Sequence, residues 1–106
     1  MMDQRKSRRY QIQLPLRVLR RGTAPFFAQG QTCNLSSHGV LFTSDRAMAV
    51  GERIEFVIRW PCAGSRDEPM DLYCLGKVLR VTSGPDPGSF SIAATLDRHA
   101  FVRLRE

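Results

Sequence analysis

The stretch Ile54-Glu-Phe-Val-Ile-Arg-Trp60 decides the fold class, because apolar and polar side chains alternate along it. Its apolar positions, at every second residue, are Ile54, Phe56, Ile58 and Trp60. Glu55 and Arg59 stand on the opposite side, so one face suits a core and the other suits water. Gly51 precedes the stretch and Pro61 follows it, and both residue types favour turns. The pattern predicts a β-strand with one buried face.

Five further strands are predicted on either side, by the same alternation or by short apolar runs between turn residues. They are residues 14–19, 27–33, 40–43, 72–81 and 90–96. The segments between them are rich in turn-forming residues, as in Asn34-Leu-Ser-Ser-His-Gly39 and Gly84-Pro-Asp-Pro-Gly88. Six strands with no helices between them predict an antiparallel β-barrel.

The C-terminal segment has a different pattern. Asp97 is a candidate N-cap for a short helix over residues 98–104, with Phe101 and Leu104 on one face. A helix of this length is marginal alone and must pack on the barrel to persist. The expected fold is therefore all-β, a six-stranded antiparallel β-barrel with a short C-terminal α-helix.

The positive charge is concentrated at the N-terminus. The chain has 106 residues, which suits one domain, and a formal net charge of +6. Residues 1–22 hold seven basic residues and one acidic residue, so they carry the whole excess and the remainder is neutral. Residues 1–12 are predicted to be a flexible basic arm, and residues 13–106 the barrel domain with its C-terminal helix. An arginine-rich arm on a neutral body indicates an anionic partner, although a solvated, disordered tail has the same composition.

Several other classes of protein are disfavoured. No run of about 18 apolar residues could span a membrane, and no apolar stretch follows the charged N-terminus as in a secretory signal, so a cytoplasmic protein is expected. The chain has an odd number of cysteines, and none of them forms a Cys-x-x-Cys pair; they are Cys33, Cys62 and Cys74. This pattern predicts reduced thiols and no metal site. No catalytic constellation and no Gly-rich phosphate loop is visible, so neither an enzyme nor a cofactor is expected.

Two motifs point to a family. Arg5-Lys-Ser-Arg-Arg9 has the form Arg-x-x-x-Arg, and the segment from Asn34 to Gly39 has the form (Asp/Asn)-x-Ser-x-x-Gly. Together, in this order, they resemble the two-part signature of the PilZ family, whose members are bacterial receptors for cyclic di-GMP. Three further stretches look like the strands that flank the motifs in PilZ domains: Gln13-Leu-Pro-Leu-Arg-Val, Val50-Gly-Glu-Arg-Ile-Glu-Phe and Leu75-Gly-Lys-Val-Leu-Arg. The resemblance covers nearly the whole chain and implies a six-stranded barrel with a C-terminal helix.

The arginines of the first motif suit a cyclic dinucleotide. Guanine presents O6 and N7 as a pair of acceptors, for which arginine is the best bidentate partner. We expect the arm to close over the ligand, with Arg5 and Arg9 on a base edge and on phosphate, or stacked on a base. Arg8 and Lys6 then add charge without a fixed geometry. In this hypothesis the arm becomes ordered when the ligand binds.

The turn residues have two interpretations. By the resemblance, Asn34 and Ser36 contact guanine and phosphate, and Gly39 permits positive φ or a close approach of the ligand. Alternatively, the segment is only a hairpin turn whose polar side chains cap their own backbone. Asn34 stands where the family often has Asp, which makes the contact neutral. Gln4 occupies a place that, in the family, influences whether one ligand or a stacked pair binds.

The expected function is that of a cyclic di-GMP receptor that signals to an unidentified protein partner, because stand-alone PilZ proteins look like adaptors. One alternative is a small β-barrel that binds single-stranded nucleic acid. The neutral body of the chain and the few aromatic residues expected on the strand surfaces disfavour it. The other alternative is a PilZ-fold interaction module that acts without a ligand.

Overall fold

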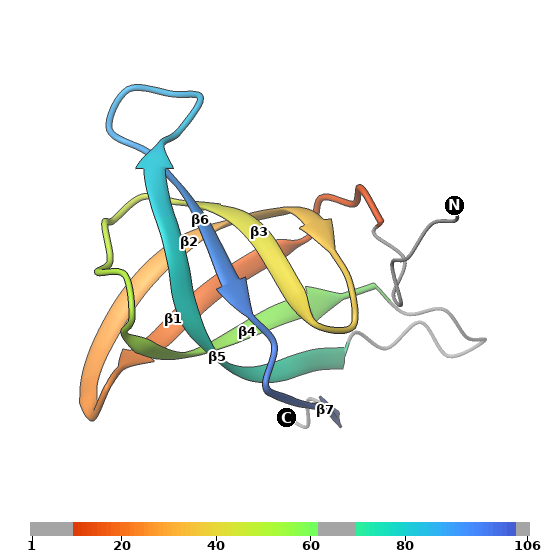
Figure 1. Ribbon diagram of the computed structural model, residues 1–106. Coiled ribbons are helices and arrows are strands. Elements are labelled where there is room, and N and C mark those ends of the chain that lie inside the picture. The colour runs from red at the N-terminus through yellow and green to blue at the C-terminus, as the bar shows by residue number, and fades with distance from the viewer. Residues whose placement is uncertain (1–9, 62–69, 104–106) are drawn as a thin grey trace, which may run out of the picture.

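The computed structural model describes residues 10–61 and 70–103, and every regular element in these ranges is a β-strand (Figure 1). The strands are β1 (Pro15–Arg21), β2 (Ala24–Leu35), β3 (Gly39–Ser44), β4 (Arg53–Trp60), β5 (Met70–Ser83), β6 (Phe90–Thr95) and β7 (Arg98–Arg103). The first six pair antiparallel in the order β4-β1-β2-β3-β6-β5, and the pairing of β4 with β5 closes the ring. The predicted six-stranded antiparallel β-barrel is confirmed.

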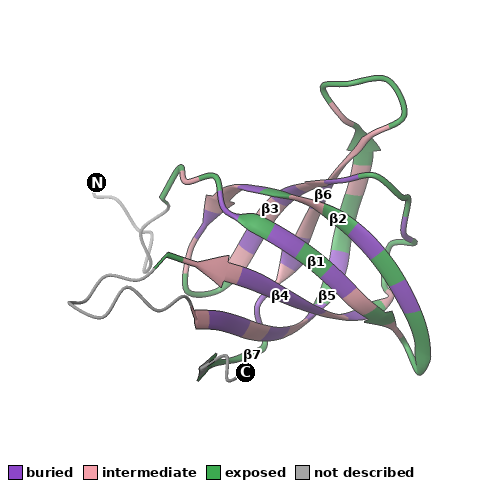
Figure 2. Ribbon diagram, turned by 180° about the vertical axis from the view of Figure 1, so that it is seen from behind, coloured by how far each residue is buried: buried purple, intermediate pink, exposed green. Residues whose placement is uncertain are grey.

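Alternate residues of the six strands fill the interior of the barrel. Figure 2 shows buried and exposed residues alternating along β1 and β2. The largest fully buried apolar side chains are Phe42, Phe56, Leu16, Ile58, Ile92, Val18 and Val78. The rings of Phe42 and Phe56 stack with their centroids 5.9 Å apart. Full burial of one such side chain contributes roughly 1.5–3 kcal/mol, so this core supplies much of the stability of the barrel.

The C-terminal segment is a strand, and the helix predicted over residues 98–104 is wrong for the six residues described. β7 pairs with the first half of β5, over residues 70–75, and the second half of β5 pairs with β6. β5 has 14 residues, so it extends beyond β6 and offers backbone groups that β7 can bond. A helix of six residues would form few internal hydrogen bonds against its nucleation penalty. Strand pairing satisfies more backbone groups, and the N–H of Asp97 donates to the carbonyl of Leu75 at 2.8 Å instead of starting a helix.

β7 also contacts the end of β4. The rings of Phe101 and Trp60 meet edge to face, with centroids 5.6 Å apart and planes at 84°. Phe101 therefore packs on the barrel as expected, but from a strand. Since the described residues form no helix, none of their elements is a helix able to cross a membrane.

Candidate ligand-binding site

One outward-facing row of residues crosses four strands on one side of the barrel. Asn34 of β2 pairs with Leu41 of β3, which pairs with Ala93 of β6. Ala93 pairs in turn with Arg80 of β5. The neighbouring row points inward and is buried; it consists of Leu35, Val40, Ala94 and Val78. The outer row thus places an amide and a guanidinium at the two ends of an apolar strip.

Two β-bulges allow the ends of this row to face outward. The register shifts at Cys33 in β2 and at Leu79 in β5, where each strand holds one residue more than its partner. A bulge lets the extra residue and its successor face the same side of the sheet. Asn34 and Arg80 are those successors, and both stand outside the core.

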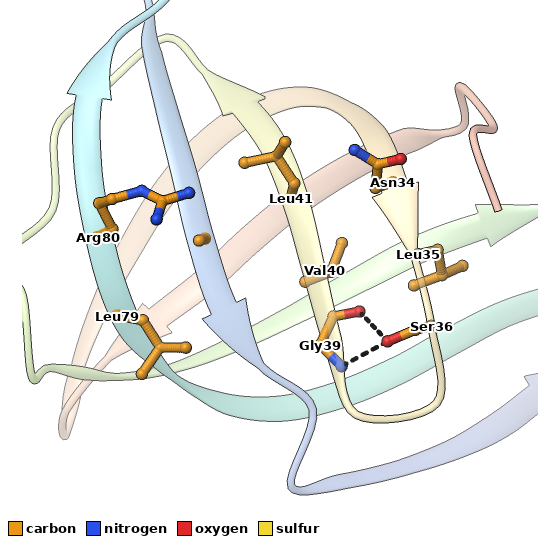
Figure 3. Close-up of a pocket in the computed structure, with 9 residues that line it drawn as sticks. Asn34, Leu35, Ser36, Gly39, Val40, Leu41, Leu79 and Arg80 are labelled. Carbon is orange, nitrogen blue, oxygen red and sulfur yellow. Dashed lines mark hydrogen bonds between the residues drawn. The ribbon is translucent and has the colours of Figure 1, made fainter. Parts of the chain in front are cut away.

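A hollow of about 200 Å3 lies along this row, between the turn that follows β2 and the bulge of β5 (Figure 3). Its walls are formed by Asn34, Leu35, Ser36, Gly39, Val40, Leu41, Leu79, Arg80 and Ala93. The structure therefore brings together three residues predicted to bind a ligand, namely Asn34, Ser36 and Gly39. A cation and apolar side chains from β5 and β6 complete the opposite wall.

Ser36 uses its hydroxyl to hold the turn between β2 and β3. Its Oγ accepts hydrogen bonds from the backbone N–H of Gly39 at 3.2 Å and of His38 at 3.3 Å. The Ser36 N–H donates to the Gly39 carbonyl at 2.9 Å. These are the capping contacts of the hairpin interpretation. Because Ser36 also lines the hollow, the same side chain shapes the turn and one wall of the site.

Gly39 lacks a side chain where two strands come close together. The described glycines with positive φ are Gly22, Gly51 and Gly88, so the positive φ considered for Gly39 is not observed. A Cβ at Gly39 would lie 3.2 Å from the carbonyl oxygen of Ala94 in β6. A larger residue would therefore press on the neighbouring strand and disturb the floor of the hollow.

Two polar groups of the hollow are open to a ligand. Within residues 10–61 and 70–103, neither the side-chain amide of Asn34 nor the guanidinium of Arg80 has a hydrogen-bond or ion-pair partner. Arg80 is exposed and Asn34 is half-buried. No acidic side chain lines the described walls of the hollow. The local field therefore favours an anion, and the amide can both donate to and accept from a base edge.

The arginines of the first motif, Arg5, Arg8 and Arg9, lie outside the described residues. The point where their segment joins the barrel is nevertheless defined. The Tyr10 N–H donates to the Leu35 carbonyl at 2.8 Å, and the Leu35 N–H donates to the Tyr10 carbonyl at 2.9 Å. Leu35 lies between Asn34 and Ser36 in the chain. Tyr10 directly follows the arginine motif in the sequence, so the first described residue after that motif lies beside the turn motif.

Sequence reasoning missed the wall that Leu79, Arg80 and Ala93 contribute. A regular alternation along β5 would turn Arg80 inward if Val78 faces the core. The one available signal is that Val78 and Val81, both on the core side, are three positions apart instead of two. Such a spacing indicates a bulge, and it would have placed Arg80 on the surface.

The family model for the PilZ domain matches residues 3–106, a range that includes both motifs and every residue of the hollow. The chain belongs to the PilZ family. PilZ domains form a family of cyclic di-GMP receptors, which act by binding the messenger and interacting with other proteins. The hollow of this PilZ domain is lined by residues of the 34–39 turn on one side and by Arg80 on the other.

A solved structure supports the architecture. This PilZ domain is similar to the Bacillus subtilis inhibitor of motility MotI/DgrA, with a TM-score of 0.68 and 14% sequence identity. The match covers 93% of this chain and 45% of that chain, so the chain spans less than half the length of its neighbour. At this identity the likeness shows the fold alone. A comparison with curated protein sequences finds no match.

Proposed function

We propose that this PilZ domain is a receptor for cyclic di-GMP, which binds in the hollow between the residue 34–39 turn and the bulge of β5. One observation carries the proposal. The turn motif and the Arg80 guanidinium face the same concave surface, and the segment with the arginine motif joins the barrel beside it at Tyr10. The described residue that follows the arginine motif, Tyr10, thus lies beside the turn motif, and this supports a single site for the two motifs.

Each wall of the hollow suits one part of the ligand. The planar guanidinium of Arg80 offers paired donors to a phosphate or to the O6 and N7 atoms of guanine. The Asn34 amide supplies a donor and an acceptor for a base edge. Leu41, Leu79 and Ala93 provide an apolar surface for the face of a purine. The site thus combines charge, hydrogen bonding and a flat contact, which a cyclic dinucleotide can use together.

The arm completes the site in this proposal. Arg5 and Arg9 close over the ligand, and Arg8 adds charge. Each charge-assisted hydrogen bond contributes roughly 1.5–3 kcal/mol, whereas micromolar affinity requires about 8 kcal/mol. The hollow and the arm are therefore both needed for tight binding, since neither supplies enough contacts alone.

The output is a change of surface. Closure of the arm would reshape the molecule beside the turn between β2 and β3, and a protein partner that prefers the closed form would be recruited by the ligand. The structural neighbour is named an inhibitor of motility, so a motility protein is one class of partner to test. The ligand is an intracellular messenger, and the proposal accordingly places the protein in the cytoplasm.

Calorimetric titration of cyclic di-GMP into the wild type and Arg9→Ala tests the proposal. We expect binding by the wild type, a loss of one to two orders of magnitude in Arg9→Ala, and no binding in the double variant Arg5→Ala/Arg9→Ala. Arg98→Ala is the matched control, because it removes the same charge from β7, outside the residues that line the hollow. GTP and a linear oligonucleotide should compete poorly. A wild type that releases no heat at ligand concentrations on the order of tens of micromolar would rule out the receptor.

A further inference from the structure

A second hollow lies next to the first on the same outer face of the barrel. The next outward row consists of Gln31, Thr43, Ser91 and Thr82, paired across the same four strands. Along β3 the two rows are represented by Leu41 and Thr43, two residues apart, which corresponds to about 7 Å. The second hollow has a volume of about 340 Å3 and extends from this row to the turn between β5 and β6. The two hollows therefore open on neighbouring rows of the same outer face of the barrel.

The two hollows differ in their chemistry. The first contains Arg80 and an apolar strip, whereas the second contains Gln13, Gln29, Gln31, Asp45 and Asp86. No lysine or arginine is found among the described residues that line the second hollow. The two carboxylates would repel a phosphate. The second hollow is therefore suited to an uncharged, polar group with hydrogen-bond donors.

Asp86 has the strongest unused acceptor of this hollow. It lies in the turn between β5 and β6, where its backbone carbonyl accepts a hydrogen bond from Ser89 Oγ at 2.7 Å. Its carboxylate has no partner in the part of the chain that the structure describes, and the same holds for the side-chain amide of Gln31. One Asp45 oxygen, in contrast, already accepts the N–H of Gln29 at 2.9 Å. Asp86 therefore offers an acceptor, and Gln31 an amide donor, to a ligand in this hollow.

A guanine base matches this pair of groups. Its Watson–Crick edge carries the N1–H and N2–H donors side by side, next to the O6 acceptor. A carboxylate can accept both donors at once, and an amide N–H can bond O6. Adenine presents an acceptor at N1, which a carboxylate would repel. The second hollow can thus distinguish the two purines.

We infer that the second hollow binds the second guanine of the cyclic dinucleotide, with Asp86 accepting its N1–H and N2–H groups and Gln31 donating to O6. This inference rests on the proposed function. A cyclic dinucleotide carries two bases joined through one ring, and a first hollow of about 200 Å3 leaves part of such a ligand outside. Occupation of both hollows makes the site selective for guanine over adenine.

The variant Asp86→Asn tests the inference through the sign of its effect. The change keeps the shape of the side chain and suits a turn, so the fold is expected to be unaffected. We expect the affinity for cyclic di-GMP to fall about 10- to 100-fold in calorimetry, while the affinity for cyclic di-AMP is unchanged or rises. If Asp86 did not touch the base, removal of a negative charge near a dianionic ligand would instead strengthen the binding of both cyclic di-GMP and cyclic di-AMP.

Asp97→Asn is the matched control, since it makes the same change of charge in the connection between β6 and β7, outside the lining of both hollows, and is expected to change the affinities for cyclic di-GMP and cyclic di-AMP equally. Gln31→Leu should weaken cyclic di-GMP binding by a smaller factor than Asp86→Asn. A wild type that binds cyclic di-GMP, together with an Asp86→Asn variant that binds it equally well or more tightly, would overturn this inference alone. A wild type that binds no cyclic di-GMP would instead refute the proposed function.

Discussion

Replacement of Arg80 by alanine separates the role of the barrel wall from that of the arm. Arg80 is exposed and has no ion-pair or hydrogen-bond partner within the ranges that the structure describes. Substitutions at such surface positions usually change the free energy of unfolding by no more than about 0.5 kcal/mol. Any larger loss of binding in Arg80→Ala must therefore come from the ligand contact and not from the fold.

The expected loss follows from the contact that Arg80 can make. One charge-assisted hydrogen-bonding group contributes roughly 1.5–3 kcal/mol, which corresponds to about a 10- to 150-fold rise in Kd for cyclic di-GMP. Arg80→Lys should fall between the wild type and Arg80→Ala, because lysine keeps the charge but lacks the planar pair of donors. Calorimetry gives the affinities, and thermal unfolding verifies that all three proteins are folded.

Arg98→Ala serves as the control for net charge. A general electrostatic effect would weaken binding to a similar extent in both alanine variants. If Arg80 makes a specific contact with the ligand, only Arg80→Ala should lose affinity. Wild-type affinity in a folded Arg80→Ala would show that the wall formed by β5 does not touch the ligand, and the placement of the site would then be refuted.

Three further predictions concern stability and thiol chemistry. Gly76→Ala should destabilise the barrel strongly or prevent folding, because the new Cβ would lie 1.8 Å from a carbonyl oxygen of β6; urea unfolding measures this. Burial raises the pKa of the Cys74 thiol to about 12, so at pH 8 an alkylating reagent should label Cys33 and spare Cys74 in the native protein, and equal labelling would contradict the buried position. Hydrogen bonds from Arg21 lower the pKa of Glu52 from its ordinary 4.5. The folded pKa is thus below the unfolded one, so this stabilisation is present above pH 4.5 and lost as the pH falls through the folded value. In Glu52→Gln the free energy of unfolding should therefore fall less steeply as the pH drops below 4.5. An unchanged dependence on pH would show that the Arg21–Glu52 ion pair contributes nothing to stability.

The barrel is predictable from the sequence because its signal is local. Each strand needs only a period of two, and Ile54, Phe56 and Ile58 are all buried as their spacing indicates. The turn motif is also local, and its residues do meet in one hollow. The positions of Arg5, Arg8 and Arg9 around a ligand remain a prediction, since they fall outside the described residues.

The bulges are less predictable because they belong to pairs of strands. Their local sign is that two core residues stand three positions apart, as with Thr32 and Leu35 in β2 and with Val78 and Val81 in β5. Whether such a spacing forms a bulge, with both intervening residues on the outer side, is decided by the pairing with the partner strand. For this reason a regular alternation along β5 does not place Arg80 on the surface.

The C-terminal strand is also decided by pairing and not by its local sequence. Phe101 and Leu104 are spaced as on one face of a helix, while His99 and Phe101 are spaced as on one side of a strand. The segment forms a strand because it pairs with residues 70–75 of β5, which β6 leaves unpaired and which lie more than twenty residues away in sequence. Long-range pairing outweighs weak local preference, as is common for short segments.

The outside of a closed barrel is convex, and a convex surface touches a small molecule on one side only. Each extra residue in the ladder, Cys33 in one strand and Leu79 in another, lines one of the two hollows. Part of the wall of each concave site thus comes from an interruption of the regular ladder. Loss of either extra residue would restore the regular alternation, so the core residues would still face inward while a hollow lost one wall residue.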